Sequence, residues 1–124
     1  MEEKKKTFTY REVCEFAIKG DIKSLEKVPK PLLSKPDGLG IRPMHLAAQH
    51  GQIGVIEWLV EDPERDAGVN KPDEDARNPL HWAAWHGQAD AVVALLEMGA
   101  LRDKATRTGY TPLHYVSCIY AGLS

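Results

Sequence analysis

The sequence predicts an all-α fold in which pairs of short helices stack into a solenoid. The main observation is a block of seven residues that occurs three times, beginning at Arg42, Asn78 and Thr111. The proline in the second position of each block gives spacings of 79 − 43 = 36 and 112 − 79 = 33 residues. A period in this range is typical of stacked repeats. A second apolar stripe after each of the first two blocks indicates that every unit holds two helices.

Each block is expected to begin a helix. A proline in the first helical position already has a helical φ angle, and the N–H that it lacks would have had no partner inside the helix. Asn78 and Thr111 precede that proline and are good N-cap residues, whereas Arg42 carries no side-chain acceptor. Gly51 and Gly87 stand eight residues after the proline, where a glycine suits a tight turn. Each unit therefore reads as a helix followed by a turn.

A second helix is expected after each of these glycines. Apolar residues recur there at helical spacing, and they are Ile53, Ile56, Leu59 and Val60 in one copy and Val92, Leu95 and Leu96 in the next. One such helix pair cannot bury its apolar face alone, so neighbouring units must cover it. Stability and function are therefore expected to belong to the array.

These blocks resemble the ankyrin repeat. The resemblance rests on Thr-Pro-Leu-His at 111–114, on the runs at 43–48 and 79–84, and on Gly99-Ala100. It covers roughly residues 10–121 and implies an ankyrin-repeat solenoid of about three and a half helix–turn–helix units joined by β-turn fingers. The chain departs from the family pattern at Arg42, where threonine is usual, and at Ala76, where the finger usually has glycine.

The domain organisation follows from the repeat register. Residues 1–6 are expected to be disordered, and 7–124 are expected to form one domain. Repeat 1, a degenerate capping unit, is placed at 7–36, repeat 2 at 37–72, repeat 3 at 73–105 and a partial repeat 4 at 106–124. In repeat 1, Thr9 and Glu12 have capping-box spacing. A second helix is expected from Asp21 to the prolines at 29 and 31, which should end it.

Two further features concern the later repeats. The polar segment 61–66 contains the three extra residues of the longer spacing and is expected on the surface. The fourth repeat breaks off after one helix and shows apolar residues such as Val116 and Ile119 without a covering unit. Two explanations stay open: the natural chain is longer or alternatively ended, or this end self-associates.

Charge, apolar content and cysteine positions argue against nucleic-acid binding, membrane spanning and secretion. The formal net charge of −2 gives no field that would attract nucleic acid. No apolar run is long enough to span a membrane, and no signal peptide is evident at the charged start. Cys14 and Cys118 fall in the first and last repeats, too far apart in a linear stack for a disulfide, which fits a reducing compartment. A cytoplasmic location is expected, with a nuclear one left open by Lys4-Lys5-Lys6.

No enzymatic site, cofactor or metal is expected. The two His-x-x-x-x-His pairs do not share a helix face, because five residues rotate the chain by about 140°. The resemblance implies instead that His45, His81 and His114 are structural, bonding loop backbone between adjacent repeats. The adjacent carboxylates Asp73, Glu74 and Asp75 are interpreted as a solvated acidic loop tip.

The resemblance further implies a concave face, formed by loop tips and first helices, that binds another protein. The positions matching that face are Leu39, Ile41, Gln49, His50, Glu74, Asp75, Arg77, Trp85, His86, Arg107, Tyr110 and Cys118. Trp85 is the residue most expected to carry binding, because exposed Trp beside Arg and Tyr is typical of hot spots. Trp58 and Trp82 are assigned to core packing. A small inhibitory subunit of an enzyme such as a kinase, or the repeat portion of a larger protein, is the alternative.

Overall fold

The computed structural model describes residues 7–66, 69–112 and 114. Within this part of the chain the helices are α1 (Tyr10–Lys19), α2 (Ile22–Leu25), α3 (Lys30–Leu33), α4 (Pro43–Gln49), α5 (Ile53–Glu61), α6 (Pro79–Trp85) and α7 (Ala89–Glu97). No strand occurs among the described residues. The prediction of an all-α solenoid is confirmed.

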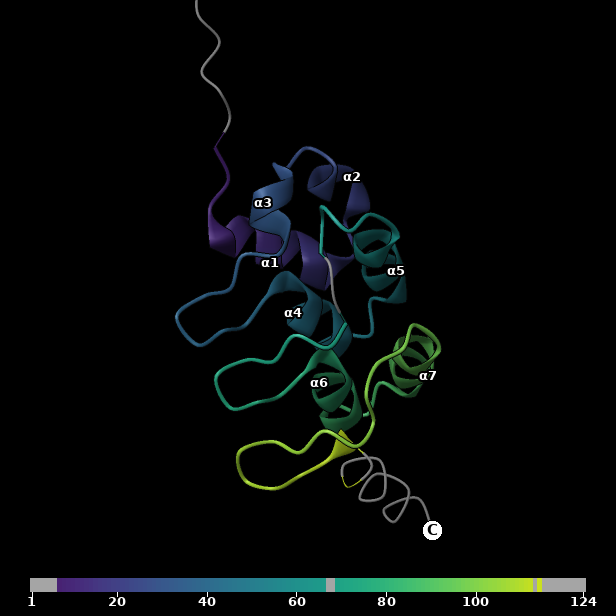
Figure 1. The fold of residues 1–124 in the computed structure, drawn as a ribbon. Coiled ribbons are helices and arrows are strands. Elements are labelled where there is room, and N and C mark those ends of the chain that lie inside the picture. The colour runs from purple at the N-terminus through teal and green to yellow at the C-terminus, as the bar shows by residue number, and fades with distance from the viewer. Residues whose placement is uncertain (1–6, 67–68, 113, 115–124) are drawn as a thin grey trace, which may run out of the picture.

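The helices lie in two layers (Figure 1). The first helices α1, α4 and α6 pack in sequence order, and the second helices α2, α5 and α7 lie on one side of them. Each first helix contributes one large side chain to a core that runs through the stack, and Val13, Met44 and Leu80 are all fully buried. Buried alanines at 47, 48 and 83 allow the first helices to approach closely.

The capping unit begins as predicted. The backbone N–H of Glu12 donates to Thr9 Oγ1 at 3.2 Å, and the Glu12 carboxylate accepts from the Thr9 N–H at 3.2 Å. This reciprocal pair satisfies two N–H groups that the helix itself cannot bond. Gly20, in the left-handed conformation at φ 73°, ends α1.

The second helix of repeat 1 differs from the prediction. Helix α2 has only four residues and ends at Leu25, before the prolines. Pro29 is instead the N-cap of α3, and Pro31 lies in its first turn. The prolines therefore begin a helix here, because a proline in the first turn lacks an N–H that would have no helical partner.

The segment 61–66 is only partly the surface insertion that the sequence predicts. Asp62 and Glu64 each lie 2.9 Å from Lys30 Nζ, which connects the segment to α3. The Arg65 guanidinium donates to the Trp58 carbonyl at 2.8 Å. Asp66, however, is 2 % exposed, so the expectation is wrong for that residue. The segment turns inward after its two exposed ion pairs.

Three β-turn fingers project on the side of the first helices, and we define them as residues 37–41, 73–77 and 106–110 (Figure 1). In each finger the first N–H donates to the fifth carbonyl, at 2.9, 2.8 and 2.7 Å in turn. Neighbouring fingers are also bonded to each other. The Glu74 N–H donates to the Leu39 carbonyl and the Arg107 N–H to the Asp75 carbonyl, both at 2.9 Å. The fingers therefore hold a common register across the repeats.

The block histidines connect one repeat to the next. His45 Nδ1 accepts from the Arg42 N–H at 3.0 Å, so its proton lies on Nε2, which donates to the Arg77 carbonyl at 3.1 Å. His81 likewise accepts from the Asn78 N–H, and its Nε2 lies 2.7 Å from the Lys104 carbonyl. The first contact crosses from repeat 2 to the finger of repeat 3, and the second reaches the loop that precedes the last finger.

A second set of ties was not anticipated from the sequence. The Gln52 side-chain amide donates to the Ile18 carbonyl at 2.8 Å, and the Gln88 amide donates to the Gln49 carbonyl at 3.0 Å. Both glutamines precede a second helix and reach back to the end of the previous first helix. Carbonyls at that helix end have no partner within the helix, so the glutamines satisfy them across the repeat boundary.

Ala76 adopts φ 61°, while glycines fill the matching finger positions at φ 76° (Gly40) and 88° (Gly109). A side chain in the left-handed region costs about 1–2 kcal/mol. Replacing that residue by glycine removes this cost, but part of the gain is lost because glycine raises the conformational entropy of the unfolded chain. We expect Ala76→Gly to raise the free energy of unfolding by about 0.5–1 kcal/mol, measured by urea denaturation. Gly109→Ala is the matched reverse, since no atom crowds a Cβ there; it should destabilise, and an unchanged midpoint in both variants would contradict the argument.

Stability should also fall in mild acid. Burial lowers the pKa of His45 to about 4 from its ordinary 6.5, and burial lowers the pKa of His81 as well. Between pH 6.5 and 4 the unfolded chain therefore binds protons that the folded chain excludes. The contribution of the neutral imidazoles to the free energy of unfolding should be fully present above pH 6.5. For His45 alone, the free energy of unfolding should fall by about 1.4 kcal/mol per pH unit as the pH drops through this window.

Urea unfolding at pH 7.5, 6 and 5 measures this dependence. His45→Gln is the control, because it removes the titrating group and should reduce the slope. A denaturation midpoint that stays constant from pH 7.5 to 5 in the wild type would show that the buried imidazole does not resist protonation.

Candidate functional site

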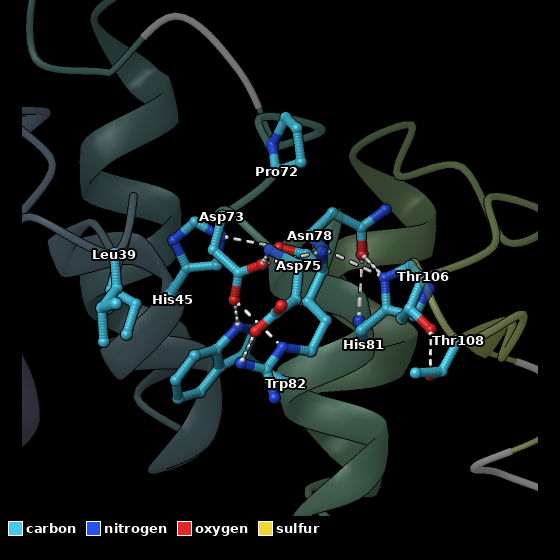
Figure 2. Close-up of polar contacts among 12 residues, drawn as sticks. Leu39, His45, Pro72, Asp73, Asp75, Asn78, His81, Trp82, Thr106 and Thr108 are labelled. Carbon is cyan, nitrogen blue, oxygen red and sulfur yellow. Dashed lines mark hydrogen bonds and ion pairs between the residues drawn. The ribbon is translucent and has the colours of Figure 1, made fainter.

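A buried carboxylate organises the middle finger (Figure 2). Asp73 Oδ1 accepts from the N–H groups of Asp75 and Arg77, both at 2.9 Å. Its Oδ2 accepts from Arg77 Nε and from the Trp82 indole N–H, both at 3.1 Å. Asp73 is 6 % exposed. The interpretation of a solvated acidic loop tip is therefore wrong for Asp73, because four donors converge on its carboxylate. Glu74 and Asp75 are exposed, as that interpretation expects.

The Arg77 side chain is held from several directions. One of its terminal nitrogens donates to Asp75 Oδ2 at 2.9 Å, in addition to the bond from Nε to Asp73. Its guanidinium carbon lies 5.4 Å from the Trp82 ring centroid and 5.9 Å from that of Trp85. A planar cation at these distances is attracted to the indole faces. Arg77 thus links the finger to helix α6.

Three aromatic side chains lie together at the end of α6, and we call Trp82, Trp85 and His86 the aromatic cluster. Their spacing of i, i+3 and i+4 places them on one helix face. The His86 ring lies 6.2 Å from Trp82 at 14° and 6.4 Å from Trp85 at 26°. His86 Nδ1 is 2.9 Å from the Trp82 carbonyl and must donate to it, so Nε2 accepts from the Gln49 amide at 3.1 Å. This bond fixes the ring against the preceding repeat.

Two adjacent hollows open beside the aromatic cluster. The first hollow has a volume of about 260 Å³ and is lined by Gln49, Arg77, His81, Trp82, Trp85 and His86. The second hollow has a volume of about 240 Å³ and is lined by Asp75, Arg77, Trp85, Thr106, Arg107 and Thr108. Both are bounded by Trp85 and Arg77. Because Trp85 is 55 % exposed, it forms a ridge between them.

The predicted surface residues divide into two groups. The hollows bring together Gln49, Asp75, Arg77, Trp85, His86 and Arg107. The others that the structure describes line neither hollow, and these are Leu39, Ile41, His50, Glu74 and Tyr110. Cys118 lies outside the described residues, as do Val116 and Ile119 of the proposed self-association end.

The sequence interpretation missed some lining residues. Trp82 was assigned to the core; it does pack against the core, but it also lines the first hollow. Its i, i+4 relation to His86 was a signal that could have placed it in the site. Thr106 and Thr108 come into the second hollow only because finger 106–110 bonds to finger 73–77. Nothing in their local sequence marks them.

Other kinds of site were also considered. No group of three histidine, cysteine, aspartate or glutamate side chains in the described part of the chain could hold a metal ion. Over the same residues, no helix has the length and apolar character needed to cross a membrane.

The Asp73 network can be tested against a matched finger. Asp37 Oδ1 accepts from the N–H groups of Leu39 and Ile41 in the same way, while the bonds from Arg77 Nε and Trp82 Nε1 belong to Asp73. We expect Asp73→Asn to lower the free energy of unfolding by about 2 kcal/mol more than Asp37→Asn, because an amide leaves those donors poorly bonded. Denaturant titration followed by tryptophan fluorescence measures both, and equal losses would refute a special role for Asp73.

Comparison with known proteins agrees with this architecture. A family model described as ankyrin repeats (3 copies) matches residues 10–104 and, in a second overlapping match, residues 44–120. A search of curated proteins found no match. The family match extends over most of the chain. The chain belongs to the ankyrin-repeat family.

Proposed function

We propose that this protein is a non-catalytic module that binds another protein on its concave face, through the aromatic cluster and the two hollows. Ankyrin repeats generally mediate protein–protein interaction. The observation that carries the proposal is Trp85, a large side chain that is 55 % exposed between two hollows. Tryptophan and arginine are the residues most enriched among those whose truncation weakens protein complexes.

Hydrogen bonds within the chain hold several side chains of this surface before any partner binds. Asp73 holds Arg77 and the Trp82 indole, and Gln49 holds His86. These side chains have therefore lost their rotational freedom on folding. A partner that docks here does not have to order them, which reduces the entropic cost of association.

The size of the hollows favours a protein ligand over a small molecule. Pockets that enclose a drug-sized molecule hold roughly 300–1,000 Å³ and cover most of its surface. The hollows here are smaller, at about 260 and 240 Å³, and they adjoin an exposed ridge. Such a surface can accept single side chains of a larger partner.

The proposal predicts the outcome of a pull-down from cell lysate. Trp85→Ala/Tyr110→Ala should lose the partner that the wild type retains, because truncating a hot-spot residue costs about 2 kcal/mol or more, roughly a 30-fold loss of affinity. Val93→Ala/Leu96→Ala is the matched control, since it removes two exposed apolar side chains from α7 without touching either hollow.

Circular dichroism must show that both double variants keep the wild-type helix content. A partner that binds both equally well would place the interface elsewhere and refute the concave-face proposal.

A further inference from the structure

The two hollows differ in chemistry. The first is lined by the three rings of the aromatic cluster, and its cation, Arg77, is already paired with Asp73 and Asp75 at 3.1 and 2.9 Å. The first hollow therefore offers apolar ring surface rather than an open charge. A planar aromatic side chain is the group that gains most from stacking on such rings.

The second hollow offers an available cation. Arg107 is exposed and lines it, and among the described residues its guanidinium has no ion pair or hydrogen bond. Its backbone N–H is bonded to the Asp75 carbonyl, so the residue has a fixed position in the finger. The hydroxyl oxygens of Thr106 and Thr108 lie 3.1 Å apart beside it. A guanidinium with five N–H donors is suited to bind a carboxylate.

The carboxylate of Asp75 does not make the second hollow favour a cationic ligand over a carboxylate. This carboxylate lines the same hollow, but it is held 2.9 Å from the Arg77 guanidinium. A lysine or arginine of a partner would have to approach two guanidinium groups, Arg77 and Arg107, to reach it. A carboxylate would meet Arg107 directly. Glu74, the other exposed acid of this finger, does not line the hollow.

We propose that the partner inserts an extended peptide segment bearing an aromatic side chain and, two to four residues along, an aspartate or glutamate. The aromatic side chain lies in the first hollow and the carboxylate binds Arg107 in the second. This inference rests on the proposed function and specifies the ligand of the same surface.

The spacing follows from the lining residues of the two hollows. The first hollow lies between repeats 2 and 3 and the second between repeat 3 and the last finger, so the two are about one repeat apart, which is about 8–10 Å for packed helices. They share Arg77 and Trp85. In an extended peptide, side chains two residues apart lie on the same side and about 6.5–7 Å from each other. Same-side positions two and four residues apart, at about 7 and 13–14 Å, bracket this separation. A peptide with an aromatic residue two to four positions from an acidic one can therefore reach both hollows.

Selection of phage-displayed random 12-residue peptides on the wild-type protein tests the ligand chemistry. The expected result is enrichment of peptides with an aromatic residue two to four positions from an aspartate or glutamate. An enriched peptide, labelled with fluorescein, is then titrated with variants and followed by anisotropy. Enrichment of basic residues beside the aromatic one, or no enrichment, would overturn the proposal.

Charge reversal separates this inference from the proposed function. Arg107→Glu should weaken the selected peptide at least about tenfold, because like charges then face each other. Arg102→Glu makes the same charge change at an exposed site outside both hollows and should leave binding unchanged. Peptide binding that is lost in Trp85→Ala but is the same in Arg107→Glu as in the wild type would refute the proposal of an acidic ligand and would leave the proposed binding surface intact. Binding that survives Trp85→Ala would overturn both.

Discussion

None of the described helices is long enough to be stable alone, and this constraint shapes the rest of the molecule. Helices α4 and α6 have seven residues each, and α5 and α7 have nine. Isolated helices shorter than about 12–15 residues are marginal in water. The chain therefore depends on burial between repeats, and its core runs from Val13 in the first unit to Leu95 in the third without interruption.

Polar contacts across repeat boundaries complement that burial. The block histidines, the glutamines that precede the second helices, and the finger-to-finger bonds all join one repeat to its neighbour. Apart from the Arg77 carbonyl, which also accepts from the Asp73 N–H, each uses a backbone group that its own element leaves unbonded, which is costly if such a group is buried. The repeats are consequently held in a single register as well as packed together.

That register builds the site. Gln49 comes from repeat 2, the aromatic cluster from repeat 3 and Arg107 from the last finger. A shift of one finger relative to the next would separate Arg107 from Trp85 and remove the second hollow. The arrangement of this surface is thus a property of the array, and the buried Asp73 carboxylate is its central support because it bonds both the middle finger and α6.

The sequence by itself determined the repeat and the starts of the helices in the repeated blocks, because these depend on local patterns: proline after a cap, glycine at a turn, and apolar residues at helical spacing. It could not show that Asp73 is buried while Asp75 is exposed, nor that Trp82 serves both core and site. Those outcomes were decided by the tertiary structure, since the bonds between neighbouring fingers join residues 35 and 32 positions apart and donors from different elements converge only after stacking. Burial of a charged group depends on such distant partners, which a pattern of neighbouring residues does not contain.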